Sequence, residues 1–142
     1  MANYGICPEA FLPFNQDPTQ APTPASDVAA LPFRIKQPLQ INPGDRIAVK
    51  TALAGTQAVA IGFYLFDSFE NPAPNGAVAI PNVNAENVHG GHAVLVCGYD
   101  DSKSWWIVRN QHGPTWADAG YCYMPYGYES IWTEAWTASP QL

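Results

Sequence analysis

The pattern of apolar and polar residues predicts one short helix, over residues 46–55. In this segment, RIAVKTALAG, Ile47, Leu53 and several alanines cluster on one side of a helical projection. Asp45 is a favourable N-cap residue, and Gly55 is a plausible C′ stop. The residues before it, 1–45, contain the stretch NQDPTQAPTPASD and are expected to be a loop-rich surface segment.

Several other segments carry the apolar, β-branched and aromatic residues that are typical of strands. Residues 57–69 are too uniformly apolar for a half-exposed strand and are therefore expected at the centre of a sheet. The turn DDSK, residues 100–103, is expected to join two strands as a hairpin. The strands are predicted at 31–41, interrupted by prolines, and at 57–69, 92–99, 105–111 and 120–126.

Period-two alternation in the strand 92–99 divides its side chains between two faces. His92, Val94 and Val96 are expected on a buried face, and Ala93, Leu95 and Cys97 on the other. His92 is expected at the end of this strand, where a cleft can open.

Length and composition support a single domain of mostly strands and loops. The chain has 142 residues, 47% of them hydrophobic and 13% charged, with 14 prolines and 11 glycines. The expected class is α+β, mostly β: a small antiparallel β-barrel or a strongly twisted sheet, with one short helix and long loops. Within one domain, 1–142, residues 1–45 form the loop-rich part, and 46–142 form the barrel part.

Charge and hydropathy exclude two classes of partner. The formal charge is −6 and no Lys/Arg cluster is present, so nucleic acid is not expected as a partner. No stretch has the roughly 18 to 20 apolar residues of a membrane span, and the N-terminus lacks the pattern of a signal peptide. If Met1 is the true start, the sequence predicts a cytoplasmic or particle-associated protein.

Three cysteines without a CxxC pair indicate neither a disulfide framework nor a cysteine zinc site. A reducing compartment fits this count best, although one disulfide with one free thiol stays open. Cys97 and Cys122 are expected to be small core residues of strands.

The candidate chemistry lies between residues 89 and 116, where all three histidines occur. His92 follows Gly90 and Gly91, which permit close approach of backbone or substrate. Asn110 lies on the next expected strand and can accept a ring N–H of His92 through its side-chain oxygen. A histidine oriented in this way is suited to act as a general base toward a thiol.

The segments GGHAVLVCGYDD and WWIVRNQHGPTWADAGYCYMPY resemble the histidine strand and the asparagine strand of papain-like cysteine peptidases. LAGTQAVAIGFYLFDSF is similar to the helix and strand that precede them, and YGICPEAFLPF is similar to the segment after the nucleophile helix in bacterial-type members. The resemblance covers nearly the whole chain. It implies a papain-like fold in which this chain corresponds to the C-terminal half.

The resemblance implies a catalytic role for two residues and supporting roles for three. His92 corresponds to the catalytic imidazole, Asn110 to the residue that orients it, and Trp116 to a packing tryptophan beside the site. Gly91 and Gln111 flank the pair. The reactive cysteine and the oxyanion glutamine of the family correspond to positions before residue 1, so no nucleophile is identified in this chain.

One substitution in the asparagine motif weakens the expected site. The usual Asn-Ser-Trp-Gly of the family reads Asn110-Gln111-His112-Gly113 here. A polar ring thus replaces the indole that shields the hydrogen bond between histidine and asparagine, although a tolerated surface substitution is expected at this position. Cys7, which precedes Pro8 and Glu9, is an improbable replacement for the missing thiol.

Three functional hypotheses remain open at the level of sequence. In the first, the chain is the C-terminal part of a cysteine peptidase, inactive alone, and a second polypeptide supplies the cysteine helix. In the second, it is an inactive relative that serves as a binding module in an assembly. In the third, His89, His92 and His112 bind a metal, although no acidic or cysteine ligand at suitable spacing completes such a site, so no metal or other cofactor is expected.

Two further expectations concern packing. The aromatic tail around Met124, Pro125 and Tyr126 is expected to pack on the barrel rather than to form a sugar or peptide stripe. If the chain keeps the papain-like geometry, the barrel face that receives the nucleophile helix is apolar and exposed, so the isolated chain is expected to fold poorly.

Overall fold

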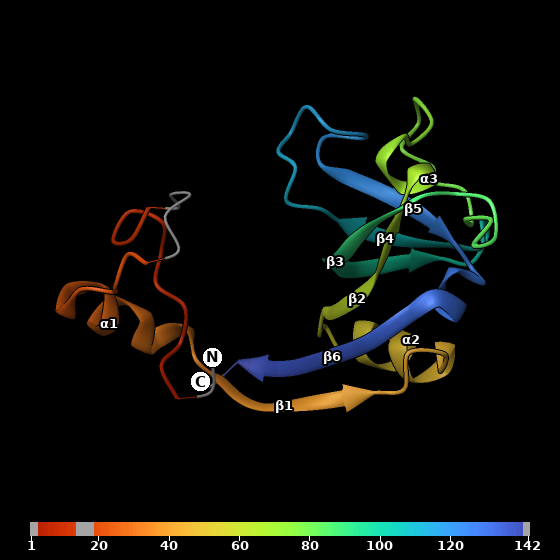
Figure 1. The fold of residues 1–142 in the computed structure, drawn as a ribbon. Coiled ribbons are helices and arrows are strands. Elements are labelled where there is room, and N and C mark those ends of the chain that lie inside the picture. The colour runs from red at the N-terminus through yellow and green to blue at the C-terminus, as the bar shows by residue number, and fades with distance from the viewer. Residues whose placement is uncertain (1–2, 14–18, 141–142) are drawn as a thin grey trace. The chain divides into compact units, whose positions relative to one another are not determined.

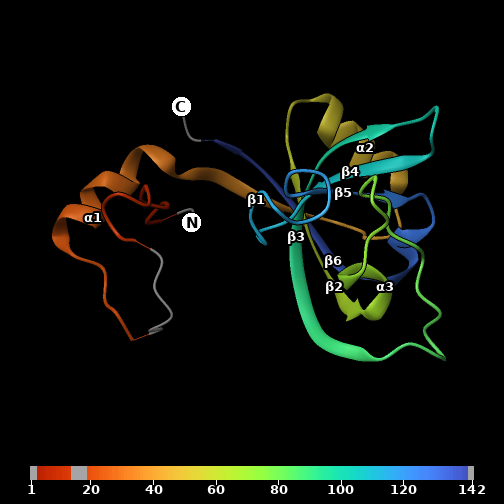
Figure 2. The same cartoon turned by 90° about the horizontal axis from the view of Figure 1, so that it is seen from above.

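The computed structural model describes residues 3–13 and 19–140 of the chain (Figures 1 and 2). It divides into two compact units, one formed by Met1–Pro38 with Ala138–Leu142 and the other by Leu39–Thr137. The helices are α1 (Pro24–Ala30), α2 (Arg46–Ala54) and α3 (Asp67–Glu70), with 3-10 turns at Leu31–Phe33 and Tyr128–Ile131. The strands are β1 (Ile35–Ile41), β2 (Val59–Phe66), β3 (Val88–Asp100), β4 (Trp105–Arg109), β5 (Tyr121–Pro125) and β6 (Trp132–Pro140).

The N-terminal unit contains a helix, α1, in a segment where the sequence predicts a loop. In α1 the Thr23 hydroxyl accepts the Ser26 backbone N–H, and the Ser26 hydroxyl accepts the Thr23 backbone N–H. This reciprocal capping box, together with proline in the first turn, starts a helix in a segment whose prolines alone suggested a loop. Ser26 is 1% exposed, so the cap is also packed.

Helix α2 confirms the predicted helix, but the side that faces the core is not the one that was expected. Asp45 caps it as expected, because its carboxylate accepts the Ala48 backbone N–H at 2.9 Å. Val49 is fully buried, whereas Ile47 is 79% exposed. Ile47 was expected on the apolar side of the helix, and this was wrong. Val49 comes two residues later, and residues two apart lie on nearly opposite sides of a helix, so burial of Val49 turns Ile47 toward solvent.

The strands form one sheet in the order β1-β6-β2-β3-β4-β5. Strand β2 pairs antiparallel with β3 and β6, and β4 pairs antiparallel with β3 and β5. Of the two forms expected, a barrel or a strongly twisted sheet, the structure has a single open sheet with β1 and β5 at its edges. The fold is otherwise of the expected class, mostly β with short helices.

Strand β6 was not predicted, although it lies inside the sheet, between β1 and β2 (Figure 1). Its segment, WTEAWTASP, is rich in small and polar residues, so its apolar signal is weak. Alternation is nevertheless present, because Ala135 and Thr137 are buried and Trp136 is exposed.

The core lies between one face of the sheet, helix α2 and the aromatic segment before β6. Tyr128 is fully buried and Trp132 is 5% exposed, which confirms that the aromatic tail packs. The members of this core with no exposed surface include Val49, Val59, Phe69, Val96, Trp106, Val108, Cys122, Met124, Tyr128 and Ala135. Among the described residues, no helix has both the length and the apolar character needed to cross a membrane.

Candidate active site

His92 lies on the core side of the sheet, within β3 rather than at its end. The strand begins at Val88, so the prediction that it starts at His92 was wrong; the glycines at 90 and 91 concealed its first part. The predicted alternation is confirmed, since Val94 and Val96 are buried and Leu95 is exposed. The half-buried histidine is paired in register with Phe63 of β2.

Two phenylalanine rings hold the imidazole of His92. The Phe63 ring meets it edge-on, with centroids 5.7 Å apart and planes at 88°, and the Phe69 ring lies 5.4 Å away. Phe69, in α3, is fully buried. The sequence did not indicate this contact, because nothing in the chain order relates α3 to the middle of β3.

His92 and Asn110 are hydrogen-bonded, as their types suggested. Nε2 of His92 lies 3.0 Å from Oδ1 of Asn110, and the Gln111 backbone N–H donates to the same oxygen at 2.9 Å. A backbone N–H always donates, so the atom that it meets must be the amide oxygen, which accepts and never donates. The proton of this pair therefore sits on Nε2 of His92, and a neutral imidazole keeps Nδ1 as a free acceptor.

Asn110 is placed by the loop that returns the chain from β4 to β5. Its backbone N–H donates to the Gly120 carbonyl at 3.0 Å, and the Gly120 N–H donates to the Trp116 carbonyl at 2.8 Å. Gly120 has φ +89°, and a Cβ there would lie 3.1 Å from the Gly113 carbonyl oxygen. Glycine is thus needed at this position to close the loop and bring Asn110 to His92.

His112 is exposed but lies beside the candidate pair. Its ring centroid is 5.4 Å from that of His92, with planes at 44°, and 5.5 Å from that of Trp116, at 88°. Trp116 is half-buried and packs on Phe69 at 5.4 Å. The substituted position of the motif therefore still supplies a ring over the imidazole, although a polar and solvated one.

The other two residues expected to support the site have simpler surroundings. Gln111 is exposed and contributes its backbone N–H to Asn110. Gly91 pairs in register with Tyr64, and a Cβ on it would meet nothing within 4 Å. Space next to this glycine is consistent with close approach of another molecule.

The three cysteines are free thiols. Cys122 is fully buried, as predicted, and burial raises its pKa to about 12. Cys97 was expected in the core but is exposed, because it lies with Ala93 and Leu95 on the side of β3 that faces away from the core. Burial of its sulfur still raises the pKa of Cys97, partly offset by a hydrogen bond and the charge of Arg109.

The geometry does not support the three-histidine metal site. His89 bonds to Asp67, with 2.5 Å between Nε2 and Oδ1, while His92 bonds to Asn110. Within the described part of the chain, no three side chains of His, Cys, Asp and Glu are grouped to hold a metal ion.

Two hollows adjoin Asn110 of the candidate pair. One, of about 490 Å³, is lined by Ala60, Ala93, Val94, Leu95, Arg109, Asn110 and Gln111. The other, of about 340 Å³, is bordered by the loop 110–121. Arg109, Asn110 and Gln111 line both.

Comparisons with known proteins identify a family for the chain. Residues 1–138 match the family model described as "Papain family cysteine protease". In an alignment of 146 positions that covers 94% of the chain, it is 29% identical to an uncharacterized peptidase C1-like protein of Acanthamoeba polyphaga mimivirus, of which it covers 47%. Over 82% of the chain it is 29% identical to a cathepsin B-like protein, CP3, of Giardia intestinalis, of which it covers 40%.

Solved structures give the same picture. Xylellain, a cysteine protease from Xylella fastidiosa, superposes on 99% of the chain with a TM-score of 0.84 and 25% identity. Bromelain protease from Ananas comosus superposes with a TM-score of 0.70 and 18% identity. The chain covers 58% of the Xylella protein and less than half of both sequence relatives.

Proposed function

The chain belongs to the papain family of cysteine proteases, and from this premise we propose that it supplies the histidine and asparagine of a cysteine-peptidase site. In this proposal His92 is the general base and acid, Asn110 orients it, and the nucleophilic cysteine lies outside residues 1–142, in a preceding segment or in a second polypeptide. The observation that carries the proposal is the hydrogen bond from Nε2 of His92 to Oδ1 of Asn110, which leaves Nδ1 free to accept a proton.

The reaction that this pair can serve is hydrolysis of an amide bond. Nδ1 of His92 takes the thiol proton, and the thiolate attacks the substrate carbonyl to form a tetrahedral adduct. The C–N bond then breaks as His92 returns the proton to the leaving amine, which leaves an acyl-enzyme. Water, deprotonated by the same imidazole, releases the acid and restores the thiol.

The surroundings of the cysteines in the unit Leu39–Thr137 favour an external nucleophile. Cys122 is buried within the sheet, and Cys97 lies on the face of β3 opposite His92. Both have a pKa above the ordinary thiol value, so both are protonated near neutral pH. Neither has the thiolate character that nucleophilic catalysis requires.

The same surroundings also favour a second candidate function, that of an inactive binding module. The two functions differ in whether a cysteine-bearing partner produces turnover. Sequencing the coding region upstream of Met1 and co-expressing its product with this chain distinguishes them. The peptidase proposal requires a Gln-x-x-x-x-x-Cys element there and hydrolysis of unstructured peptides that is lost in His92→Ala and kept in Lys103→Ala.

A complex that forms without hydrolysis would favour the binding module and contradict the peptidase proposal. The purified chain alone is expected to show no hydrolysis. Incubation with a thiol-directed inactivator tests this: stoichiometric labelling of Cys7, with turnover abolished in parallel, would contradict the need for an external nucleophile.

A further inference from the structure

Helix α3, which carries Phe69, is too short to be stable by itself. It spans only Asp67–Glu70, and an isolated helix of one turn does not persist in water. Phe66, which precedes it, has no side-chain acceptor to cap its free N–H groups. The Phe69 ring nevertheless packs with its centroid 5.4 Å from that of His92 and 5.4 Å from that of Trp116. Contacts from outside the helix therefore hold it beside the candidate site.

Glu86 supplies the missing cap from a distant position in the chain. Its Oε2 accepts the backbone N–H of Ser68, in the first turn of α3 and 18 positions earlier, at 2.8 Å. Its Oε1 accepts the Asn82 backbone N–H at 2.8 Å. The loop 71–87 leaves α3 and returns to the start of β3 (Figure 2), and this one carboxylate fastens it to the helix.

Asp67 ties the same helix to the residues at the start of β3. Its Oδ2 accepts the Asn87 backbone N–H at 3.1 Å, and its Oδ1 is hydrogen-bonded to Nε2 of His89. Hydrogen bonds from His89 and from the Asn87 backbone lower the pKa of Asp67, and the two backbone N–H groups at Glu86 lower the pKa of that residue. Both carboxyls are therefore ionised at neutral pH.

His89, the partner of Asp67, is the extra residue of a bulge in β3. Val88 and Gly90 are opposite neighbouring residues of β2, so the register shifts by one at His89. A bulge changes the direction in which the following side chains point. The contact with Asp67 thus fixes the bulge three residues before His92.

We propose that Asp67 and Glu86 are positioning residues of the candidate site. By holding α3 they keep the Phe69 ring against the imidazole of His92, where it limits the access of water to the hydrogen bond with Asn110. This inference rests on the proposed function, since the position of the imidazole matters for catalysis only if His92 transfers protons. A purely structural role would lower the stability of the fold and leave the imidazole unchanged.

The tautomers of His92 test the inference in the chain alone. Long-range ¹H–¹⁵N NMR well above the ordinary imidazole pKa of about 6.5 measures their ratio, and the nuclear Overhauser effect between the rings of Phe69 and His92 reports their contact. In Asp67→Ala and in Glu86→Ala the contact should weaken. The ratio should shift toward Nδ1–H by about threefold to tenfold, or about 0.6–1.4 kcal/mol, as water competes for the hydrogen bond.

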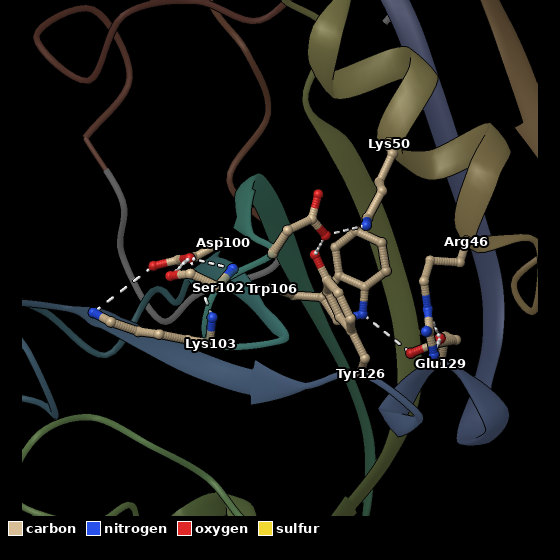
Figure 3. Close-up of polar contacts among 9 residues, drawn as sticks. Arg46, Lys50, Asp100, Ser102, Lys103, Trp106, Tyr126 and Glu129 are labelled. Atoms are coloured by element: carbon tan, nitrogen blue, oxygen red, sulfur yellow. Dashed lines mark hydrogen bonds and ion pairs between the residues drawn. The ribbon is translucent and has the colours of Figure 1, made fainter.

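Asp100→Ala is the matched control. Asp100 lies on the same strand as His92 and also accepts backbone N–H groups, those of Ser102 and Lys103, at 3.0 and 3.3 Å (Figure 3). Like Asp67 it pairs with a basic side chain, that of Lys103. Its loss should also destabilise the fold, but the tautomer ratio of His92 should stay at the wild-type value.

Conservative variants provide the rescue. Asp67→Asn keeps an oxygen for the Asn87 backbone N–H and should restore most of the wild-type ratio. Thermal melts show whether each variant is folded; each retains the other carboxylate. Where an alanine variant is unfolded, Glu86→Gln replaces it, since it keeps one of two hydrogen bonds and should give a smaller shift in the same direction. An unchanged ratio, an equal shift in Asp100→Ala, or a shift with the contact between the rings intact would overturn the inference.

The fate of the proposed function is decided separately, because these measurements need no nucleophile. In a complex that hydrolyses peptides, Asp67→Ala should lower kcat by about threefold to tenfold, in line with the tautomer shift, and leave KM unchanged. Wild-type kcat in a variant with a shifted ratio would refute the positioning role alone. No hydrolysis by the wild-type complex, with the ratio shifted in the variants, would refute the peptidase alone.

Discussion

His92 and Asn110 share one hydrogen bond whose direction is determined by a third group. The Gln111 backbone N–H fixes the oxygen of the Asn110 amide on the side of His92, so the imidazole must donate from Nε2. The tautomer that leaves Nδ1 free is thus a property of this chain, independent of any partner.

Asn110→Ala is expected to release the tautomer of His92. Without the acceptor, the Nε2–H form loses a hydrogen bond of about 0.5–1.5 kcal/mol and both tautomers become populated. Long-range ¹H–¹⁵N NMR well above the ordinary imidazole pKa of about 6.5 measures the two forms. Gln111→Ala is the control, because it keeps the backbone N–H; equal tautomer populations in wild type and Asn110→Ala would show that Asn110 does not orient the ring.

Glu129→Ala is expected to be among the most destabilising single substitutions in this unit. The carboxylate, 6% exposed, accepts the Trp106 indole N–H at 3.1 Å and the Gly127 backbone N–H at 2.7 Å, and pairs with Arg46. Its loss leaves donors unpaired and should cost about 3–5 kcal/mol in urea unfolding. Glu134→Ala, which removes an exposed carboxylate bonded to Trp136, should cost less than about 1 kcal/mol, and similar costs for both would contradict this role.

The same carboxylate predicts acid sensitivity. Burial raises the pKa of Glu129, but hydrogen bonds from Trp106, Arg46 and the backbone outweigh it, so the pKa lies below the ordinary 4.5. Its stabilisation is therefore fully present above pH 4.5 and is lost as the pH falls through the lowered value. Melting temperatures across this range should fall less steeply in Glu129→Gln than in the wild type, and parallel curves would contradict the assignment.

Two glycines near the candidate site should respond oppositely to the same substitution. Gly120→Ala places a side chain at φ +89° and 3.1 Å from a carbonyl oxygen, so it should cost about 1–3 kcal/mol and shift the Asn110 resonances. Gly91→Ala meets nothing within 4 Å and should change the free energy of unfolding by less than about 1 kcal/mol. Chemical denaturation and ¹⁵N spectra test both, and equal costs would show that loop closure does not depend on Gly120.

The sequence predicted those parts of the molecule that depend on local signals. The cap at Asp45, the hairpin after Asp100 and the alternation that buries Val94 follow from neighbouring residues. Strand β6 was missed because its pairing with β2 depends on residues some 70 positions apart in the sequence. The choice between a barrel and an open sheet was left undecided for a related reason, since alternation does not encode the order of the strands.

The candidate site was predictable to the extent that its residues lie in two short segments. The contact between His92 and Asn110 joins neighbouring strands, so residue type and hairpin connection indicated it. The packing of Phe69 against the imidazole and the lack of an ion pair at Arg109 among the described residues could be found only from the structure. Both depend on which side chains from distant segments fill, or fail to fill, the space around them.

Thiol reactivity provides a last prediction, and it bears on the source of the nucleophile. Cys122 has no exposed surface and a pKa near 12, so iodoacetamide should not modify it before the chain unfolds. Cys97 is exposed, but its raised pKa should make alkylation slower than that of a free cysteine at the same pH. Mass spectrometry of tryptic peptides against time measures both rates, and Cys97→Ala identifies its label. Two results would contradict this prediction: modification of Cys122 in the native state as fast as that of Cys97, or labelling of Cys97 faster than that of free cysteine. Either result would mean that this unit contains an activated thiol. The reason for seeking the nucleophile elsewhere would then be gone.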